Sequence, residues 1–339
     1  MQSIIPLKPT YFLSYASAVG KAEWEGPYGK YFDYHDTTDR FGKSKWEQAE
    51  GNLSHFVLNL ALGKLGLHHK ALSFLFSGDL QNQCVASSEG HLDEQIPYLG
   101  LYGACSTCTE ALLLSAVMLE SLQAGVIGAA VTTSHNSAAE RQFRTPLEYG
   151  GQRPPTAQWT ATAGGAFLLT QAKQNAPFIS RVMPGVMVSG GITDAFNMGA
   201  AMAPAAAHSI KAFLSLQKEK AKDYDAIVTG DLGREGSALL EMLLLEENIP
   251  ISGVHMDCGA MLYDPKKKDC HSGGSGCGCS ASLLAAHFLP SLAKGDYHRI
   301  LFLSTGALMS PSSIQQGGEI IGIAPVIEIC APKVEETEK

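Results

Sequence analysis

The chain has 339 residues, of which 45% are hydrophobic and 17% charged, and its formal net charge is −8. This length allows a large core in one large domain or two fused ones, and the acidic balance argues against a nucleic-acid partner. The first ten residues, MQSIIPLKPT, lack a secretion-signal pattern, and no run approaches the roughly 18 apolar residues of a membrane helix. We therefore expect a cytoplasmic protein that contacts a membrane only peripherally or through a partner.

Taken in order, the patterns alternate between strands and helices. Apolar residues three and four apart predict a helix over 46–65. Short apolar runs predict strands over 10–19, 72–76, 126–133 and 161–169. Polar loops are expected over 24–45 and 141–155, the second with three arginines. This alternation is typical of an α/β fold.

The most distinctive stretch runs from Tyr102 to Gly125. It opens with small residues around Cys105, continues as an apolar helix, and ends at a glycine suited to a C-cap. A cysteine just ahead of a helix meets the positive end of the helix dipole, which favours the thiolate. Cys105 is therefore a candidate nucleophile or the wall of an anion pocket, and the alternative is an inert buried thiol.

Eight cysteines without a secretion signal indicate free thiols, not a disulfide framework. Cys105 and Cys108 form a CxxC pair, and a CGC triplet at 277–279 follows Cys270. These groups lie far apart in Gly- and Ala-rich stretches, unlike a zinc knuckle, and the βαβ context of a thioredoxin motif is not evident. We expect no metal site and no cofactor.

The second half of the chain repeats the motifs of the first in the same order. The matched pairs are 38–41 with 193–196, 77–80 with 229–232, and 111–116 with 281–286. A repeat this long indicates two fused α/β halves, at 1–176 and 177–339, each with a mostly parallel sheet between helices. The cysteine helix and its counterpart at 280–294 are expected to be the two buried central helices.

A duplicated α/β chain with Ala-Cys-Ser at 104–106 before a buried helix resembles the thiolase/ketoacyl-synthase superfamily. The resemblance implies a five-layer αβαβα fold with two duplicated halves, usually as a homodimer, with the nucleophile at Cys105. More narrowly, the segments SYASAVGKAEWEGPYGKYFD, TTDRFGKSKWEQAE and GACSTCTEALLLSAVMLESLQAG are similar to the stage V sporulation protein AD family of spore-forming bacteria. The first two segments are not shared by the enzymes.

The chain departs from the enzymes in the groups that assist the cysteine. The resemblance places a His or Asn after the first strand of the second half, where this sequence has Asp231, and a second His at His271. Acyl transfer needs a thiolate, oxyanion donors and a proton relay, and a carboxylate at Asp231 would repel an enolate. We therefore expect a non-catalytic binding protein. The alternatives are acyl transfer by Cys105 and a scaffold with a vestigial pocket.

The sporulation family binds dipicolinic acid (pyridine-2,6-dicarboxylic acid), free or as its calcium chelate. The resemblance implies that this chain helps move the compound into the developing spore and out at germination, with the membrane proteins of its operon, at the cytoplasmic face of the spore inner membrane. Free N–H groups at the helix start would hold a carboxylate. The candidate ligand-binding residues are Cys105, His271, Cys108, Tyr102, His135 and Asp231, with an arginine of the 141–153 loop as a further candidate.

Overall fold

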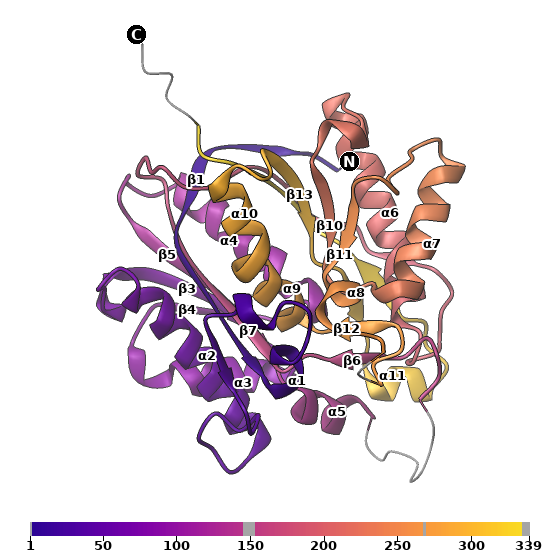
Figure 1. Cartoon of the computed structure of the whole chain (residues 1–339), viewed down its shortest axis with the longest axis horizontal. Coiled ribbons are helices and arrows are strands. Elements are labelled where there is room, and N and C mark those ends of the chain that lie inside the picture. Colours follow the sequence, from indigo (N-terminus) through magenta and orange to yellow (C-terminus); the bar gives the residue numbers. More distant parts are fainter. Residues whose placement is uncertain (1, 145–152, 267–268, 334–339) are drawn as a thin grey trace.

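The computed structural model describes residues 2–144, 153–266 and 269–333, and within α5 the side chain of Arg144 is also not described. Two sets of five strands run through it (Figure 1). Across the first set the order is β4 (Tyr98–Leu101), β3 (Leu72–Gly78), β5 (Ile127–Ser134), β7 (Ala163–Thr170) and β1 (Ile5–Gly20). Across the second it is β11 (His255–Asp257), β10 (Ala226–Thr229), β13 (Arg299–Leu303), β16 (Val326–Cys330) and β8 (Phe178–Met183).

The two sets share one topology, so the duplication inferred from the motifs is repeated in the strand order. In each set the first three strands are parallel and the last two are antiparallel to their neighbours. The expected mostly parallel sheets are therefore mixed sheets. A buried strand has the same continuous apolar run in either direction, so its sequence carries no sign of a reversal.

The long strand β1 joins the two sets, because it pairs with β7 on one side and β8 on the other. The short β2 (Tyr34–Asp36) also pairs with β1. The two sets and β2 thus form one large sheet, and two small sheets lie apart from it. They are β12 (Gly273–Ser275) with β6 (Gln158–Thr160), and β14 (Gly306–Leu308) with β15 (Ile321–Ile323) and β9 (Val188–Ser189).

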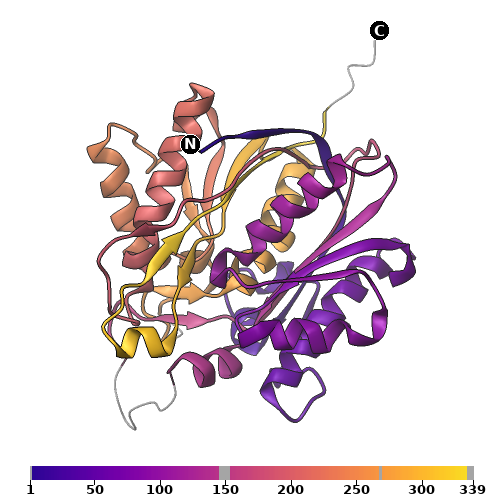
Figure 2. The same ribbon diagram turned by 180° about the vertical axis from the view of Figure 1, so that it is seen from behind.

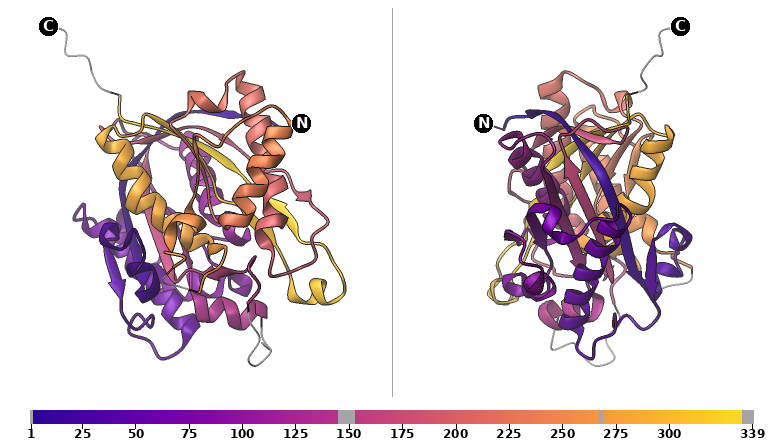
Figure 3. Two further views of the ribbon diagram at one scale, coloured as in Figure 1. Left: turned by 45° about the vertical axis from the view of Figure 1, so that its right-hand side comes forward. Right: turned by 90° about the vertical axis from the view of Figure 1, so that its left-hand side faces the viewer.

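Three layers of helices alternate with the two strand sets, as Figures 2 and 3 show from behind and from the sides. The outer layers are α2 (Trp46–Gly63) with α3 (Val85–His91), and α6 (Met198–Gln217) with α7 (Gly233–Glu246). The central layer is α4 (Thr107–Glu120) with α9 (Cys277–Leu283), a π-helical turn (Leu284–Phe288) and α10 (Leu289–Lys294). The remaining helices are α1 (Lys21–Trp24), α5 (Asn136–Arg144), α8 (Cys258–Leu262) and α11 (Pro311–Gln315).

The buried apolar residues confirm this layering. One cluster packs the central helices against strands of both halves, a second joins α6 and α7 to the second half, and a third joins α2 to the first half. The expected five-layer α/β fold is confirmed, and so are the two buried central helices. The division at 176/177 lies between β7 and β8 and stays a prediction as a domain boundary.

The helix predicted over 46–65 is α2, but the loop predicted over 141–155 begins inside α5, and its residues 145–152 lie outside the described part of the chain. Among the described residues, every helix falls short of the length and apolarity that a membrane crossing requires.

Candidate functional site

Cys105 lies in a short 3₁₀ turn (Ala104–Ser106) that leads into α4. Ala104 adopts a left-handed conformation with φ of 53°, which turns the chain sharply before the helix. The helix behind it is buried on almost every side, as its apolar sequence predicts. Cys105 is 5% exposed, so its surroundings decide whether the thiol is buried in the core or faces a cavity.

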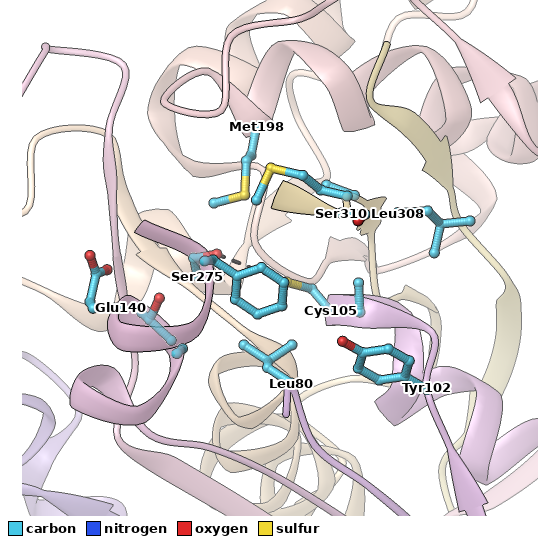
Figure 4. Close-up of a pocket in the computed structure, with 14 residues that line it drawn as sticks. Leu80, Tyr102, Cys105, Glu140, Met198, Ser275, Leu308 and Ser310 are labelled. Carbon is cyan, nitrogen blue, oxygen red and sulfur yellow. Dashed lines mark hydrogen bonds between the residues drawn. The ribbon is translucent and has the colours of Figure 1, made fainter. Parts of the chain in front are cut away.

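A cavity of about 290 Å³ lies beside Cys105, so the thiol is not enclosed in solid core (Figure 4). Its wall is mostly apolar and comes from both halves of the chain. The larger apolar side chains on it are Leu80, Phe143, Met198, Leu308 and Met309. The polar side chains are Cys105, Ser275, Thr160, Ser310, Tyr102 and Glu140. A mostly apolar cavity with a few polar groups is typical of a small-molecule site.

Behind Cys105, hydrogen bonds connect the cavity to the end of β10. The Cys105 Sγ lies 3.9 Å from the Ser275 Oγ, which donates to the Asp231 Oδ2 at 3.2 Å. The Gly276 N–H donates to the same oxygen at 2.7 Å, and the Thr305 hydroxyl donates to Oδ1 at 2.9 Å. Asp231 thus holds in place the turn that carries Ser275.

Burial controls the ionisation of this group. It raises the pKa of Asp231 to about 7, although hydrogen bonds from Cys105, Gly276 and Thr305 act in the opposite direction. Burial, and then the charge of Asp231, raise the pKa of Cys105 well above its ordinary value. The thiolate expected from the helix dipole is therefore not favoured, because burial outweighs the dipole. Cys105 carries a thiol.

The structure places His271 beside Asp269 and not on the wall of the cavity that Cys105 lines. The His271 Nε2 lies 2.8 Å from the Asp269 Oδ1, and the ring is not part of the cavity wall. Between His271 and Ser275 the chain turns at Gly273, with φ of 125°, and enters β12, which pairs with β6. Ser275, four residues on, is the side chain that faces Cys105.

The other candidates divide between the cavity and the core. Tyr102 lies on the cavity wall and donates its hydroxyl to the Asn82 Oδ1 at 2.9 Å. Cys108 is buried inside α4, where burial raises its pKa to about 11. The His135 Nε2 lies 2.7 Å from the Asp39 carbonyl oxygen, and burial lowers its pKa. Cys108 and His135 do not line the cavity.

The arginines expected from the 141–153 loop are engaged elsewhere where their side chains are described. Arg141 pairs with Glu47, and Arg153 donates to the Gln158 carbonyl and packs over Trp159. The side chain of Arg144 lies outside the described part of the chain. The cavity wall therefore carries a carboxylate, Glu140, and no described arginine.

Sequence comparison places the chain in one family. The family model described as "Stage V sporulation protein AD (SpoVAD)" matches residues 1–330. The stage V sporulation protein AD of Bacillus subtilis (strain 168) is 40% identical over 316 residues, which is 93% of each chain.

Solved structures with the same fold are much more distant in sequence. A tetronic acid condensing enzyme, AbyA1, has a TM-score of 0.58 at 16% identity, covering 94% of this chain and 99% of its own. A single-site variant of OleA from Xanthomonas campestris has 0.60 at 12%, covering 96% and 99%. 3-oxoacyl-[acyl-carrier-protein] synthase III of Aquifex aeolicus VF5 has 0.52 at 11%, covering 94% and 99%. This chain is therefore a sporulation protein of the stage V sporulation protein AD family, built on a thiolase-like fold.

Proposed function

We propose that this protein binds dipicolinic acid, free or as its calcium chelate, without turning it over. The observation that carries the proposal is the cavity of about 290 Å³ beside a cysteine kept as a thiol. Its volume lies at the lower end of the range for small-molecule sites, as a single substituted pyridine ring requires. Leu80, Phe143 and Met198 supply apolar surface for the ring, and the start of α4 supplies N–H groups for a carboxylate.

Binding is favoured over acyl transfer by the groups around Cys105. A nucleophilic cysteine needs a nearby base or a lowered pKa, but its neighbours are the Ser275 hydroxyl and, behind it, the Asp231 carboxyl. The negative charge of Asp231 opposes both thiolate formation and an oxyanion. Acyl transfer through Cys105 stays the alternative, because proteins with this fold include enzymes.

The charges at the cavity favour the calcium chelate over the free dianion. Glu140 lies on the wall, and Asp231, whose pKa burial raises to about 7, lies behind Cys105, so neither side chain supplies a positive charge for a free dicarboxylate. In the chelate the metal balances the two ligand charges. Calcium also accepts six to eight oxygen ligands, which leaves it positions for protein hydroxyls or a carboxylate such as Glu140.

Calorimetry with dipicolinate tests the proposal, once with equimolar calcium and once with a chelator present. The variant Ala307→Phe fills the cavity and is expected to abolish binding, whereas Ala124→Phe, at an exposed loop position, keeps it. No binding by the parent protein in either condition, or full binding by Ala307→Phe, contradicts the proposal. A mass increase on Cys105 after incubation with acetyl-CoA would support the acyl-transfer alternative.

We further infer that two copies associate through the edge strand β4 and α4. Leu99 on β4 is 54% exposed, and Leu114 and Met118 of α4 are also exposed. A strand at the edge of a sheet has free N–H and C=O groups on its outer side, and these can pair with a strand of a second copy. Sedimentation is expected to show a dimer that Leu99→Lys converts to a monomer, and a monomeric parent protein would contradict this inference.

Family membership supports the rest of the proposed role. We infer that the protein acts with the membrane proteins of its operon in dipicolinate uptake and in release at germination, bound peripherally at the cytoplasmic face of the spore inner membrane. Fractionation of sporulating cells tests the location. Recovery only in the soluble fraction, in cells where the operon's membrane proteins are present, would contradict it.

A further inference from the structure

The neighbouring elements of the fold bury only some of the apolar residues of helix α7. From Ala238 to Leu245 the sequence is ALLEMLLL, with Glu241 as the one polar residue. A helix that is apolar on all sides is typical of a buried position. Here Leu240 and Leu244 are buried in the cluster shared with α6, but Met242 is 61% exposed and Leu245 is 63% exposed. One face of the helix is thus covered and the opposite face is not.

The uncovered face has a regular composition. The residues that share it by helical spacing are Glu235, Ala238, Met242, Leu245 and Glu246, and all five are exposed. The apolar side chains lie in the middle, with one carboxylate in the first turn and one in the last. We refer to these five residues as the α7 face. It lies on the outer surface of the second half, at the opposite edge of the large sheet from β4 (Figures 1 and 3).

The carboxylates of the α7 face differ from that of Glu247 in their surroundings, as far as the described residues show. Among the described residues no cationic side chain pairs with Glu235 or Glu246, whereas Lys211 of α6 pairs with the adjacent Glu247 at 2.9 Å. Glu246 also lies at the C-terminal end of the helix, where the dipole is negative and a carboxylate is unfavourable. A cation placed there would relieve both effects.

We propose that the α7 face binds a cationic amphipathic helix of another protein. Apolar side chains at i and i+4 of such a helix would pack on Met242 and Leu245, and Lys or Arg near its two ends would meet Glu235 and Glu246, roughly 16 Å apart along the axis. Complementary charge at the ends sets the register, and the apolar centre contributes most of the binding. The proposal concerns a surface remote from the cavity and does not depend on ligand binding there.

Two other occupants fit the charges less well. An anionic membrane surface attracts lysines and arginines, but this face presents carboxylates. In an antiparallel two-fold pair of α7 helices, Glu235 of each copy would lie near Glu246 of the other, and like charges at such positions are repulsive. The acidic ends therefore select a basic protein segment.

Site-specific photo-crosslinking in sporulating cells tests the proposal on the full chain. The probe is p-benzoylphenylalanine at Met242, and the control is the same probe at Met187, which is 67% exposed in the loop between β8 and β9. The expected product joins position 242 to the apolar side of an amphipathic helix of one other protein, with Lys or Arg near the ends of that helix. The control position is expected not to join that protein.

Crosslinks from Met242 only to lipid, only to a second copy of this chain, or to nothing would each overturn the proposal. A second measurement places the probe at Ala238 in the variant Glu235→Lys with Glu246→Lys, where the crosslink is expected to fall at least tenfold. Unchanged crosslinking there also overturns it. Dipicolinate titration of the same variant is expected to match the parent protein, so a failed surface and a failed ligand site give different results.

Discussion

The two halves carry the same motif at the same place and use it differently. Ser77-Gly78-Asp79-Leu80 begins at the end of β3 and continues past it, and Thr229-Gly230-Asp231-Leu232 does the same at β10, which is also the second strand of its set. The Asp79 carboxylate accepts from the Gln81 N–H at 2.6 Å and from the Ser87 N–H and hydroxyl at 2.7 and 2.6 Å. The Asp231 carboxylate instead accepts from Ser275, Gly276 and Thr305.

The difference shows how a duplicated motif acquires a separate task. Asp79 bonds to residues that follow it within the same turn and helix, so it organises its own loop. Asp231 bonds to two distant segments, one of which presents Ser275 to the cavity. Burial raises the pKa of both carboxyls, but only Asp231 also acts on the pKa of Cys105. Substitutions at the two aspartates and at Ser275 test whether Asp79 only stabilises its own loop while Asp231 supports the cavity.

The largest expected effect is on folding stability at Asp79. The change Asp79→Ala leaves the buried N–H groups of Gln81 and Ser87 without their acceptor, and we expect it to lower the free energy of unfolding by about 3 kcal/mol. Asp231→Ala leaves one such N–H, that of Gly276, so its loss is expected at about 1 kcal/mol. Urea unfolding measures both. An equal or larger loss at Asp231 would contradict the division.

The sequence was enough to find the fold, because a repeated order of motifs and an apolar helix after Cys105 leave few arrangements of two α/β halves. It did not identify Ser275. The resemblance to the enzymes favoured His271, but the direction of the chain after Gly273 decides which residue faces the cavity. The internal repeat does point to Ser275. The register that pairs 111–116 with 281–286 also pairs Cys105 with Ser275.

The cavity wall was the least predictable part. Glu140 and Phe143 lie on α5, in or beside a segment expected to be a loop, and Met309 and Ser310 come from the far end of the chain. Their meeting depends on tertiary packing between the halves, which no local pattern records. The raised pKa of Cys105 was equally hidden, because a helix start predicts the dipole but not the degree of burial.

The next effect is on the pH dependence of stability. Because burial raises the pKa of Asp231 from 3.8 to about 7, the native state keeps a proton there that the unfolded chain has already released. Stability is therefore expected to fall as pH rises through this window. Asp231→Asn should remove the part of this decrease that one titrating group contributes. Between pH 5 and 6.5 that part is about 2 kcal/mol in the free energy of unfolding. Burial also raises the pKa of Glu23 to about 7, but Glu23 is present in both proteins, so its effect on the pH dependence cancels in the comparison.

Thermal or urea unfolding of the parent protein and Asp231→Asn across that pH range measures the difference. Asp79→Asn cannot serve as a matched control, because it disturbs the loop, so Asp269→Asn at an exposed site takes that role. Identical slopes in the parent protein and Asp231→Asn would mean that Asp231 is ionised throughout the window.

A smaller effect is expected on the reactivity of Cys105. Asp231→Asn removes the negative charge that adds to the effect of burial, so the pKa of the thiol falls toward its ordinary value. We expect alkylation of Cys105 by iodoacetamide at pH 8 to become faster by about severalfold, because a lower pKa gives a larger fraction of thiolate. Peptide mass spectrometry identifies the residue, and buried Cys108 serves as the internal control. No change at Cys105 would show that burial alone governs it.

The smallest effect separates His271, which the resemblance favoured, from Ser275, which lies beside Cys105. His271→Ala removes a ring paired with exposed Asp269 and is expected to change stability by less than about 0.5 kcal/mol and dipicolinate affinity by less than about twofold. Ser275→Ala removes the hydroxyl between Cys105 and Asp231 and is expected to weaken binding by about fivefold, the equivalent of one hydrogen bond. Calorimetry compares the pair directly. A larger loss of affinity in His271→Ala than in Ser275→Ala would mean that His271 reaches the cavity when ligand is bound. The hydrogen bonds of Asp231 to the turn that carries Ser275 would then not explain the site.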